Sequence, residues 1–242
     1  MLSGRRPVLE ALKAGHVPER ILVARGLAPS SVIGEIRRRA EGSSIPVDVV
    51  PRDQIDRLEP ELNHQGVVAL APHYRYTALE RILGAPRSAV LFCDGIMDPH
   101  NLGSLLRSAD GAGAGGVVIP ARRAVAVTPA VRRVSAGAAE TMPVARVPNI
   151  ATALERARSR NLWIAGLDQD ADDDLWTSSL LDPPAAIVVG AEDRGLSTPV
   201  RDRCDGFVSI PSAGRLSSLN VAAAGAVALF EVARRARALA HD

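Results

Sequence analysis

The sequence has few aromatic residues, only two cysteines and no long apolar run, and each shortage excludes a class of protein. Aromatic residues make up 3% of the chain, too few for broad surfaces on which nucleic-acid bases stack. Cys93 and Cys204 lie far apart, which is typical of reduced thiols rather than of a disulfide framework. No apolar run approaches the roughly 18 residues of a membrane span, and the first residues lack the apolar core of a signal peptide. We therefore expect a cytoplasmic protein.

The charge of the chain is nearly balanced, with a formal net value of +2. Lys13 is the single lysine, so arginine supplies 28 of the 29 basic residues. Arginine is the better ligand for phosphate, but a GC-rich genome produces the same bias, and both explanations stay open. The hydrophobic share of 47% in 242 residues is enough for one large or two small domains with buried cores.

Patterns of strands and helices divide the sequence into two regions. Residues 1–71 alternate helical and extended signals and predict a small α/β domain. Residues 72–87 mix proline, glycine and a short helical stretch, which is typical of a linker. A second α/β domain is expected over 88–242. The first region is expected to contain helices at 7–14 and 30–40 and strands at 20–24, 47–50 and 66–71.

The second region predicts a doubly wound α/β domain. Two segments, AVLFC and AAIVV, are apolar at every position, as are strands buried on both faces of a parallel sheet. Helices between the strands would cover both faces of that sheet. The expected strands are 89–93, 116–119, 144–147, 163–167, 185–189 and 206–210, and the expected helices are 99–111, 129–134, 150–160 and a long helix that ends the chain.

The loop after the first of these strands leads into a capped helix. Asp98 is placed to cap it and Pro99 occupies its first position. Gly103 and Arg107 are four residues apart and share a face, so the glycine is expected to clear space beside the arginine. An arginine in such a place meets an anionic or hydroxyl ligand, although a surface pair with Asp110 is equally consistent with the spacing. The apolar stripe of this helix is expected to be Leu102, Leu105, Leu106 and Ala109.

Two further loops follow predicted strands near the end of the chain. Gly190 and Gly195 permit sharp turns and close backbone approach, and Glu192 between them can accept hydrogen bonds. After residue 210, Ser217 or Ser218 is expected to cap the last helix, with Asn220 in its first turn. Carboxyl ends of parallel strands share one edge of the sheet, where α/β proteins bind ligands. The three loops are therefore expected to form one group-transfer site built on positioning.

Two segments imitate known binding motifs but lack their context. Residues 111–116 read GAGAGG, yet a helix precedes them and a strand follows, the reverse of the dinucleotide-binding order. Residues 168–174 resemble a calcium-binding loop but have aspartate at its sixth position instead of glycine. We expect a solvated loop there, and no metal site.

The chain resembles the SpoU/TrmH family of RNA 2′-O-ribose methyltransferases, in the SPOUT superfamily. Three segments carry the resemblance in the family's order: DGIMDPHNLGSLLRSA, IVVGAEDRGLS and IPSAGRLSSLNVAAAGAVALFE. The intervening VRRVSAGAAETMPVARV, the HQG turn at 64–66 and the early GRRPVLEAL also match, so the resemblance covers nearly the whole chain. It is greatest to the bacterial subgroup that methylates a guanosine of large-subunit ribosomal RNA.

This resemblance implies a fold and an activity that composition and spacing do not. It implies a trefoil-knotted second domain that binds S-adenosylmethionine, a ribosomal-protein-like RNA-binding domain over 1–71, and a homodimer in which the partner helps to build each site. The implied substrate is a guanosine of 23S rRNA in the peptidyl-transferase region. The implied catalytic residues are Asn101, Arg107, Glu192, Ser218 and Asn220, and the implied cofactor contacts are Gly190, Ile210 and Leu219.

Other functions are left open by the sequence. A related enzyme that modifies transfer RNA, or one that confers antibiotic resistance through ribosomal RNA, shares the same motifs. A non-catalytic RNA-binding protein would use residues 1–71 alone, and a small-molecule enzyme would leave that region without a role. Arg107 is the implied activator of the ribose hydroxyl, and because a guanidinium stays protonated near neutral pH we expect it to stabilise charge.

Overall fold

The computed structural model describes residues 1–242 except 14, 16, 59–63, 71–73, 85–87, 213, 215–218 and 241–242. The chain forms two units, Met1–Tyr74 and Arg75–Asp242. No helix among the described residues is both long and apolar enough to span a bilayer. Ser217 and Ser218, which the sequence suggested as caps of the last helix, lie outside the described residues.

The first unit is a small α/β domain whose sheet has the strand order β1-β4-β2-β3. Strands β2 and β3 are parallel, whereas β4 runs antiparallel to both β1 and β2. Helices α1 and α2 contribute Val8, Leu9 and Ile36 to a core on one face of this sheet. The elements are β1 (Leu2–Ser3), α1 (Arg5–Lys13), β2 (Arg20–Ala24), α2 (Ser31–Gly42), β3 (Val47–Val50), α3 (Arg52–Leu58) and β4 (Val67–Leu70).

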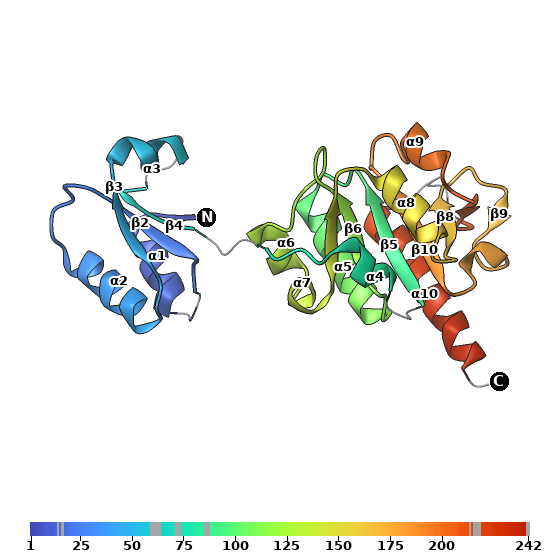
Figure 1. Ribbon diagram of the computed structural model, residues 1–242, viewed down its shortest axis with the longest axis horizontal. Helices are drawn as coiled ribbons and strands as arrows, with labels where there is room; N and C mark the ends of the chain where they lie inside the picture. The colour runs from blue at the N-terminus through green and yellow to red at the C-terminus, as the bar shows by residue number, and fades with distance from the viewer. Residues whose placement is uncertain are drawn as a thin grey trace. The chain divides into compact units, whose positions relative to one another are not determined.

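The second unit has a parallel sheet with the strand order β7-β6-β5-β10-β8-β11-β9 (Figure 1). This is the predicted class of fold, a mainly parallel sheet with helices on both faces. Its elements are α4 (Leu79–Leu83), β5 (Ala89–Asp94), α5 (Pro99–Gly111), β6 (Val117–Pro120), α6 (Pro129–Val134), α7 (Ala138–Thr141), β7 (Val144–Val147), α8 (Ile150–Arg158), β8 (Trp163–Leu167), β9 (Asp173–Asp174), the 3₁₀ helix η1 (Ser179–Leu181), β10 (Ala185–Gly190), α9 (Thr198–Arg201), β11 (Gly206–Ser209) and α10 (Val221–Leu239).

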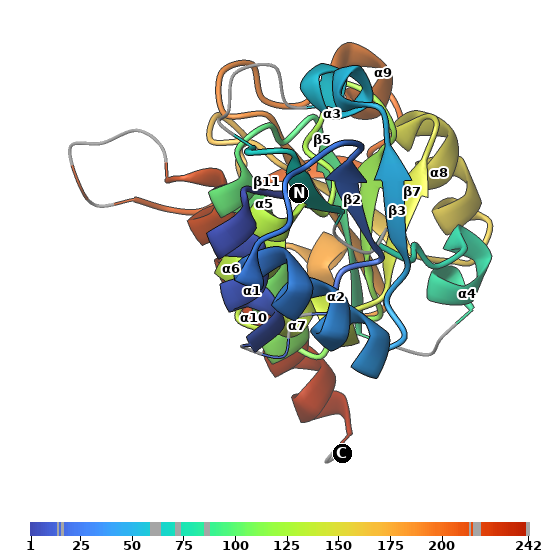
Figure 2. The same cartoon turned by 90° about the vertical axis from the view of Figure 1, so that its left-hand side faces the viewer.

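The central strands β5 and β10 are apolar because both of their faces are covered. Phe92 and Val188 face a core that includes Leu154 of α8, whereas Leu105 and Leu229 belong to helices on the opposite side. Figure 2 shows α5 and α10 on one side of the sheet and α4 and α8 on the other. Burial on both faces explains why these strands read as continuous apolar runs.

Helix α5 begins as the sequence predicts but packs differently at Gly103. The Asp98 side chain accepts a hydrogen bond from the His100 amide (2.9 Å), which confirms the predicted cap. The predicted apolar stripe is fully buried. A Cβ on Gly103, however, would lie 2.6 Å from the Cβ of Val134 in α6. The glycine therefore admits a neighbouring helix, and the expectation that it clears space for Arg107 is wrong.

The segment expected to be a linker is in part a piece of the second unit. Leu79 and Ile82 of α4 are buried in that unit's core, and the Thr77 amide donates to Val144 O of β7 (2.7 Å). The Tyr76 hydroxyl also accepts a hydrogen bond from the Val127 amide (3.1 Å). The apolar residues of this stretch explain why 75–84 is ordered against the sheet instead of connecting two domains freely.

Helix α10 is capped by Asn220 and not by a serine. The Asn220 side chain accepts a hydrogen bond from the Ala222 amide (2.9 Å) and lies just before the helix instead of in its first turn. A Cβ on Gly225 would lie 2.5 Å from a methyl carbon of Leu105, so this glycine lets α10 pack closely on α5. The predicted trefoil knot stays a prediction.

Candidate functional site

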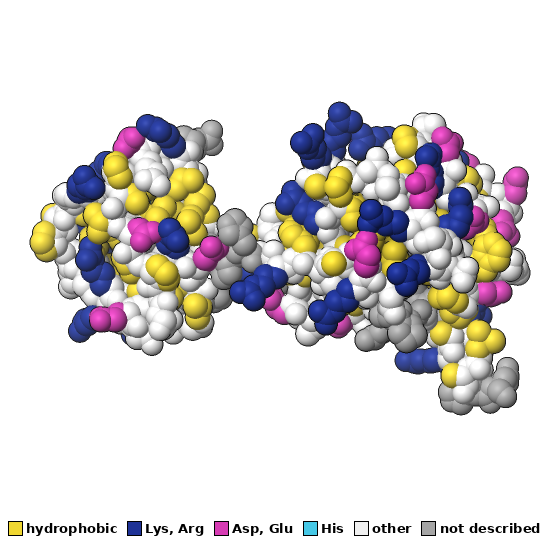
Figure 3. Space-filling view, viewed as in Figure 1, with side chains coloured by type: hydrophobic (Ala, Val, Ile, Leu, Met, Phe, Trp, Pro, Cys, Tyr) yellow, Lys and Arg dark blue, Asp and Glu magenta, His cyan; other side chains and the backbone are white. Residues whose placement is uncertain are grey.

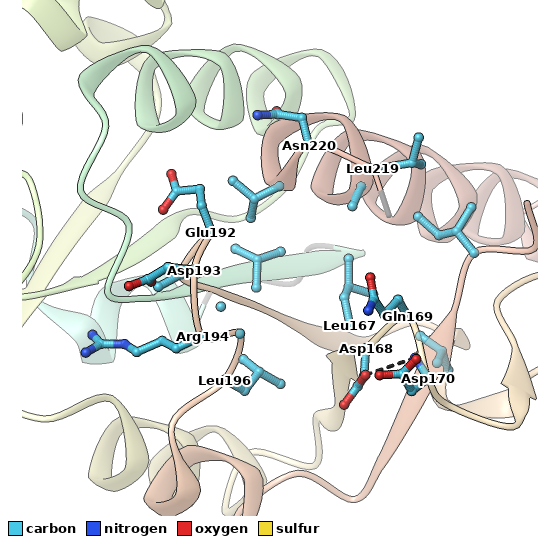
Figure 4. A pocket seen from close by; sticks show the side chains of 18 of the residues that line it. Leu167, Asp168, Gln169, Asp170, Glu192, Asp193, Arg194, Leu196, Leu219 and Asn220 are labelled. Carbon is cyan, nitrogen blue, oxygen red and sulfur yellow. Dashed lines mark hydrogen bonds between the residues drawn. The ribbon is translucent and has the colours of Figure 1, made fainter. Parts of the chain in front are cut away.

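A cleft of about 640 Å³ lies at the carboxyl ends of β8, β10 and β11 (Figure 4). Apolar side chains and polar loop residues both contribute to it, as in most small-molecule sites. Its walls come from the loops after these three strands and from the first turn of α10. The lining residues are Leu167, Asp168, Gln169, Asp170, Val189, Gly190, Ala191, Glu192, Asp193, Arg194, Gly195, Leu196, Arg201, Val208, Ile210, Ser212, Leu219, Asn220, Val221 and Ala224.

The turn after β10 is held in one conformation by close backbone contact. Ala191 and Gly195 exchange two backbone hydrogen bonds (3.0 and 2.9 Å). A Cβ on Gly190 would lie 2.1 Å from the carbonyl carbon of Gly195, so no side chain fits at that position. Gly195 itself has φ of +64°, which favours glycine. The tight turn fixes Glu192 at the edge of the cleft.

Three polar side chains from three segments form one hydrogen-bonded chain. Asn220 Nδ2 donates to Asn101 Oδ1 (3.0 Å), and Asn101 Nδ2 donates to Glu192 Oε1 (2.5 Å). Asn101 lies in the first turn of α5 and is 9% exposed, which is unusual for an amide side chain. These two hydrogen bonds connect α5 and the start of α10 to the turn after β10. The structure thus brings together three of the predicted catalytic residues.

The predicted cofactor contacts also lie together, because Gly190, Ile210 and Leu219 all line the cleft. Ser218 lies outside the described residues. Leu219 is half-exposed, whereas Ile210 is partly buried beyond the end of β11. Two separate segments, the turn after β10 and the approach to α10, therefore meet around the same space.

Arg107 is not among the residues that line the cleft. It lies six residues after Asn101, which corresponds to about 9 Å along the axis of α5, and its side chain is exposed. Asp110 accepts a hydrogen bond from the Thr141 hydroxyl (3.3 Å), and within the described part of the chain it forms no ion pair with Arg107. The alternative surface pair is therefore not observed, and a single chain does not bring the guanidinium into the cleft.

The loop after β8, which the sequence suggested was merely solvated, forms one wall of the cleft. Asp168 bonds to the Arg201 guanidinium, and this hydrogen bond holds the pKa of Asp168 below its ordinary value. Arg201 in turn lies over the ring of Phe207, 4.2 Å from its centroid. The position of this loop after a buried parallel strand was the signal that could have placed it at the same edge.

The cleft combines an apolar floor with acidic walls. Leu167, Val189 and Val208 supply apolar surface, and Asp170, Glu192 and Asp193 supply carboxylates, whereas the Asp168 carboxylate is paired with Arg201. Figure 4 shows Glu192 and Asn220 on one side of the space and Asp168 with Gln169 on another. Such a site suits a ligand with an apolar ring and a positive charge, held beside amide groups that orient a second reactant.

Comparison with known families identifies the class of protein. The SpoU rRNA methylase family model matches residues 88–230, and the model for the RNA 2′-O ribose methyltransferase substrate-binding domain matches residues 1–77. The chain therefore belongs to the SpoU rRNA methylase family, and it is an RNA methyltransferase.

Individual relatives agree with this membership. A Mycobacterium ulcerans protein, named an uncharacterized tRNA/rRNA methyltransferase, is 42% identical over 97% of this chain and 76% of its own length. The crystal structure of the SpoU methyltransferase AviRb from Streptomyces viridochromogenes, in complex with AdoMet, covers 98% of this chain and 90% of its own at 29% identity and a TM-score of 0.63. A crystal structure of an RNA 2′-O ribose methyltransferase covers 98% of this chain and 88% of its own at 28% identity and a TM-score of 0.59.

Proposed function

We propose that this protein transfers a methyl group from S-adenosylmethionine to the ribose 2′-hydroxyl of a guanosine in large-subunit (23S) ribosomal RNA. The observation that carries the proposal is the chain of hydrogen bonds Asn220–Asn101–Glu192 at the edge of the cleft. Membership of the SpoU family supports the reaction class, and resemblance to one subgroup supports the choice of nucleotide.

The cleft fits S-adenosylmethionine in size and in chemistry. Its volume of about 640 Å³ lies within the range of about 300–1,000 Å³ that is usual for small-molecule sites. Leu167, Ile210 and Leu219 offer apolar surface for an adenine ring, and the acidic walls complement a sulfonium cation. When bound, this cofactor supplies an electrophilic methyl group.

The protein's own contribution is to place and polarise the ribose. Aligning two bound reactants can be worth about 7–11 kcal/mol of the barrier. Asn101 and Glu192 hold each other in a fixed orientation, so either can meet a ribose hydroxyl without further ordering. Asn220 fixes Asn101 and at the same time caps α10. We assign Ser218 a part in orienting the ribose on the family motif alone.

Arg107 requires a second subunit in this proposal. Its guanidinium is exposed and does not line the cleft of its own chain. In a homodimer, the arginine of one protomer would reach the ribose bound by its partner. There it would hold the adjacent phosphate and stabilise the alkoxide that forms as the hydroxyl loses its proton, because a guanidinium remains protonated in proteins.

The first unit would bind the RNA substrate. The match to the substrate-binding family model covers all of it. Arg5 and Arg6 begin α1, and Arg37, Arg38 and Arg39 form a basic run in α2. Arginine contacts with phosphates supply affinity without reading sequence, so the choice of nucleotide would depend on RNA shape and on the second unit.

Methyl transfer to purified RNAs tests the proposal. The protein is incubated with S-adenosylmethionine labelled in its methyl group and with either 23S rRNA or transfer RNA that lacks 2′-O-methylation. We expect label in 23S rRNA only. Label in transfer RNA alone would favour the related transfer-RNA enzymes, and no label in any RNA, with cofactor binding intact, would favour a non-catalytic RNA-binding protein.

A further inference from the structure

Three arginines from two loops gather at the carboxyl edge of the second unit, beside the cleft. Arg122 and Arg123 lie in the loop after β6, and Arg194 lies in the turn after β10. All three side chains are exposed. Figure 3 shows basic side chains gathered along the upper edge of this unit, where Figure 1 draws the loop that follows β6. We call these three residues the arginine rim.

The loop after β5 brings the rim together. Gly95 has φ of +83°, and a Cβ built on it would lie 2.8 Å from a guanidinium nitrogen of Arg194 and 3.7 Å from the carbonyl oxygen of Arg123. The two arginines therefore flank one glycine, and Arg194 packs directly on its backbone. Figure 4 shows Arg194 extending away from Asp168 and Gln169, out of the part of the cleft that those residues line.

The loop that carries Arg122 and Arg123 is anchored at several points. Arg146 donates to Ala121 O (2.8 Å) and lies over the ring of Tyr76, 5.6 Å from its centroid. The Val125 amide donates to Ile96 O (2.8 Å), and the Val127 amide donates to the Tyr76 hydroxyl. The arginines therefore lie on a fixed loop, so little conformational entropy of this loop is lost when a ligand binds.

The three arginines of the rim are positively charged, and no acidic side chain among the described residues pairs with them. Elsewhere in this unit Arg132, Arg156 and Arg201 each pair with a carboxylate. Within the described residues, none of the three rim arginines forms an ion pair or a side-chain hydrogen bond. Neighbouring unpaired guanidiniums repel one another, and a polyanion laid across them removes that repulsion and releases counterions.

We propose that the arginine rim binds the phosphates of the RNA strand that flanks the target nucleotide. Guanidinium groups match phosphate geometry with paired donors. Glu192 belongs to the same turn as Arg194, so a strand on the rim has its ribose close to the Asn101–Glu192 pair. The rim is a positioning surface, separate from the RNA-binding first unit. The inference rests on the proposed function.

The central experiment compares two pairs of arginine substitutions in the full-length protein. Arg122→Gln with Arg123→Gln removes two rim charges and keeps the methylene stems. Arg81→Gln with Arg160→Gln is the matched control, because both arginines are exposed. Arg81 precedes β5 and Arg160 precedes β8, so both lie toward the amino ends of the strands, at the edge opposite the cleft. Methyl transfer to the RNA that the wild type accepts is measured from 50 to 200 mM salt, together with S-adenosylmethionine binding by calorimetry.

The variant with Arg122→Gln and Arg123→Gln, the rim pair, should have a KM for RNA several-fold above that of the wild type. Its kcat and cofactor affinity should stay within about twofold of wild type, because the lost contacts hold the RNA equally in the ground state and the transition state. The slope of log affinity against log salt should fall by about 1.4, because each phosphate contact on a single strand contributes about 0.7. Adding Arg194→Gln should lower the salt slope further. The variant with Arg122→Lys and Arg123→Lys should keep most of the wild-type slope.

A rim pair that behaves like the control pair in KM and in salt slope would overturn the inference while the wild type still methylates RNA. A wild type that binds S-adenosylmethionine but methylates no RNA would instead refute the proposed function. A rim pair that lowers kcat without changing KM or the salt slope would also refute a role in holding phosphates.

Discussion

Asn101→Asp is the substitution that probes the hydrogen-bonded chain most sharply. The variant keeps the oxygen that accepts from Asn220, but it replaces the amide donor with a carboxylate oxygen 2.5 Å from Glu192 Oε1. Two unit charges about 4 Å apart repel by about 1 kcal/mol in water and by about 4 kcal/mol at an effective dielectric constant of 20. Because Glu192 is exposed, we expect a repulsion between these limits.

The repulsion makes the stability of the variant depend on pH. The carboxyl introduced at position 101 should have its pKa raised in the folded state, because a second carboxylate beside it disfavours the ionised form. A raised folded pKa gives stability that is present below the unfolded value, near 4, and is lost as pH rises through the folded value. The variant should therefore be more stable at pH 5 than at pH 8, relative to the control.

Asn101→Ala is the control, because it removes the same donor without adding a charge. It should lower the free energy of unfolding by about 0.5–1.5 kcal/mol for each hydrogen bond lost, because its partners Glu192 and Asn220 are exposed and water can replace Asn101, with no new dependence on pH. Urea unfolding of both variants at pH 5 and pH 8 measures the difference. If the gap between the two variants is the same at both pH values, Asn101 and Glu192 do not share the hydrogen bond described here.

Four further outcomes are expected. Gly190→Ala should destabilise the fold by at least about 1–3 kcal/mol and abolish S-adenosylmethionine binding, since the new methyl group meets backbone at 2.1 Å; a stable, cofactor-binding variant in thermal melts and calorimetry would contradict this. Arg107→Ala should lower kcat about 100-fold or more with unchanged cofactor affinity, and full activity would remove it from the mechanism. Burial raises the pKa of Cys93 and raises that of Cys204 to about 12, so iodoacetamide at pH 8 should label neither thiol until urea is added. The hydrogen bond from Arg234 lowers the pKa of Glu231, so the stability that the ionised carboxylate gives the fold is lost as pH falls below about 4. In Glu231→Gln the free energy of unfolding should therefore depend less on pH in this range. The same pH dependence in the variant and the wild type would argue against the Glu231–Arg234 pair.

Much of the second unit could be predicted because its local signals agree with its packing. The bounds of α5 and α6 follow from prolines in their first turns and caps at Asp98 and Thr128. Strands buried on both faces produce apolar runs that are hard to mistake. Short elements were missed: α3, α7 and α9 have seven residues or fewer, too few for a helical period to appear in the sequence.

The site was predictable only where its residues follow strands. Gly190 ends β10 and Glu192 follows two residues later, so their edge of the sheet could be inferred. The residue that packs against Gly103 could not be predicted, because it is Val134, which is distant in the sequence. Asn220 as a cap and Asn101 as its partner depend on a contact between residues 119 positions apart. No local pattern encodes such a contact.

The position of the transferred methyl group is the decisive measurement for a ribose methyltransferase. RNA labelled by the protein is digested completely with alkali, which cleaves only where a free 2′-hydroxyl can attack the neighbouring phosphate. We expect the label to remain in an alkali-resistant dinucleotide whose 5′ residue is guanosine. Label recovered entirely in mononucleotides would place the methyl group on a base and would contradict a cleft that presents a ribose to the methyl donor.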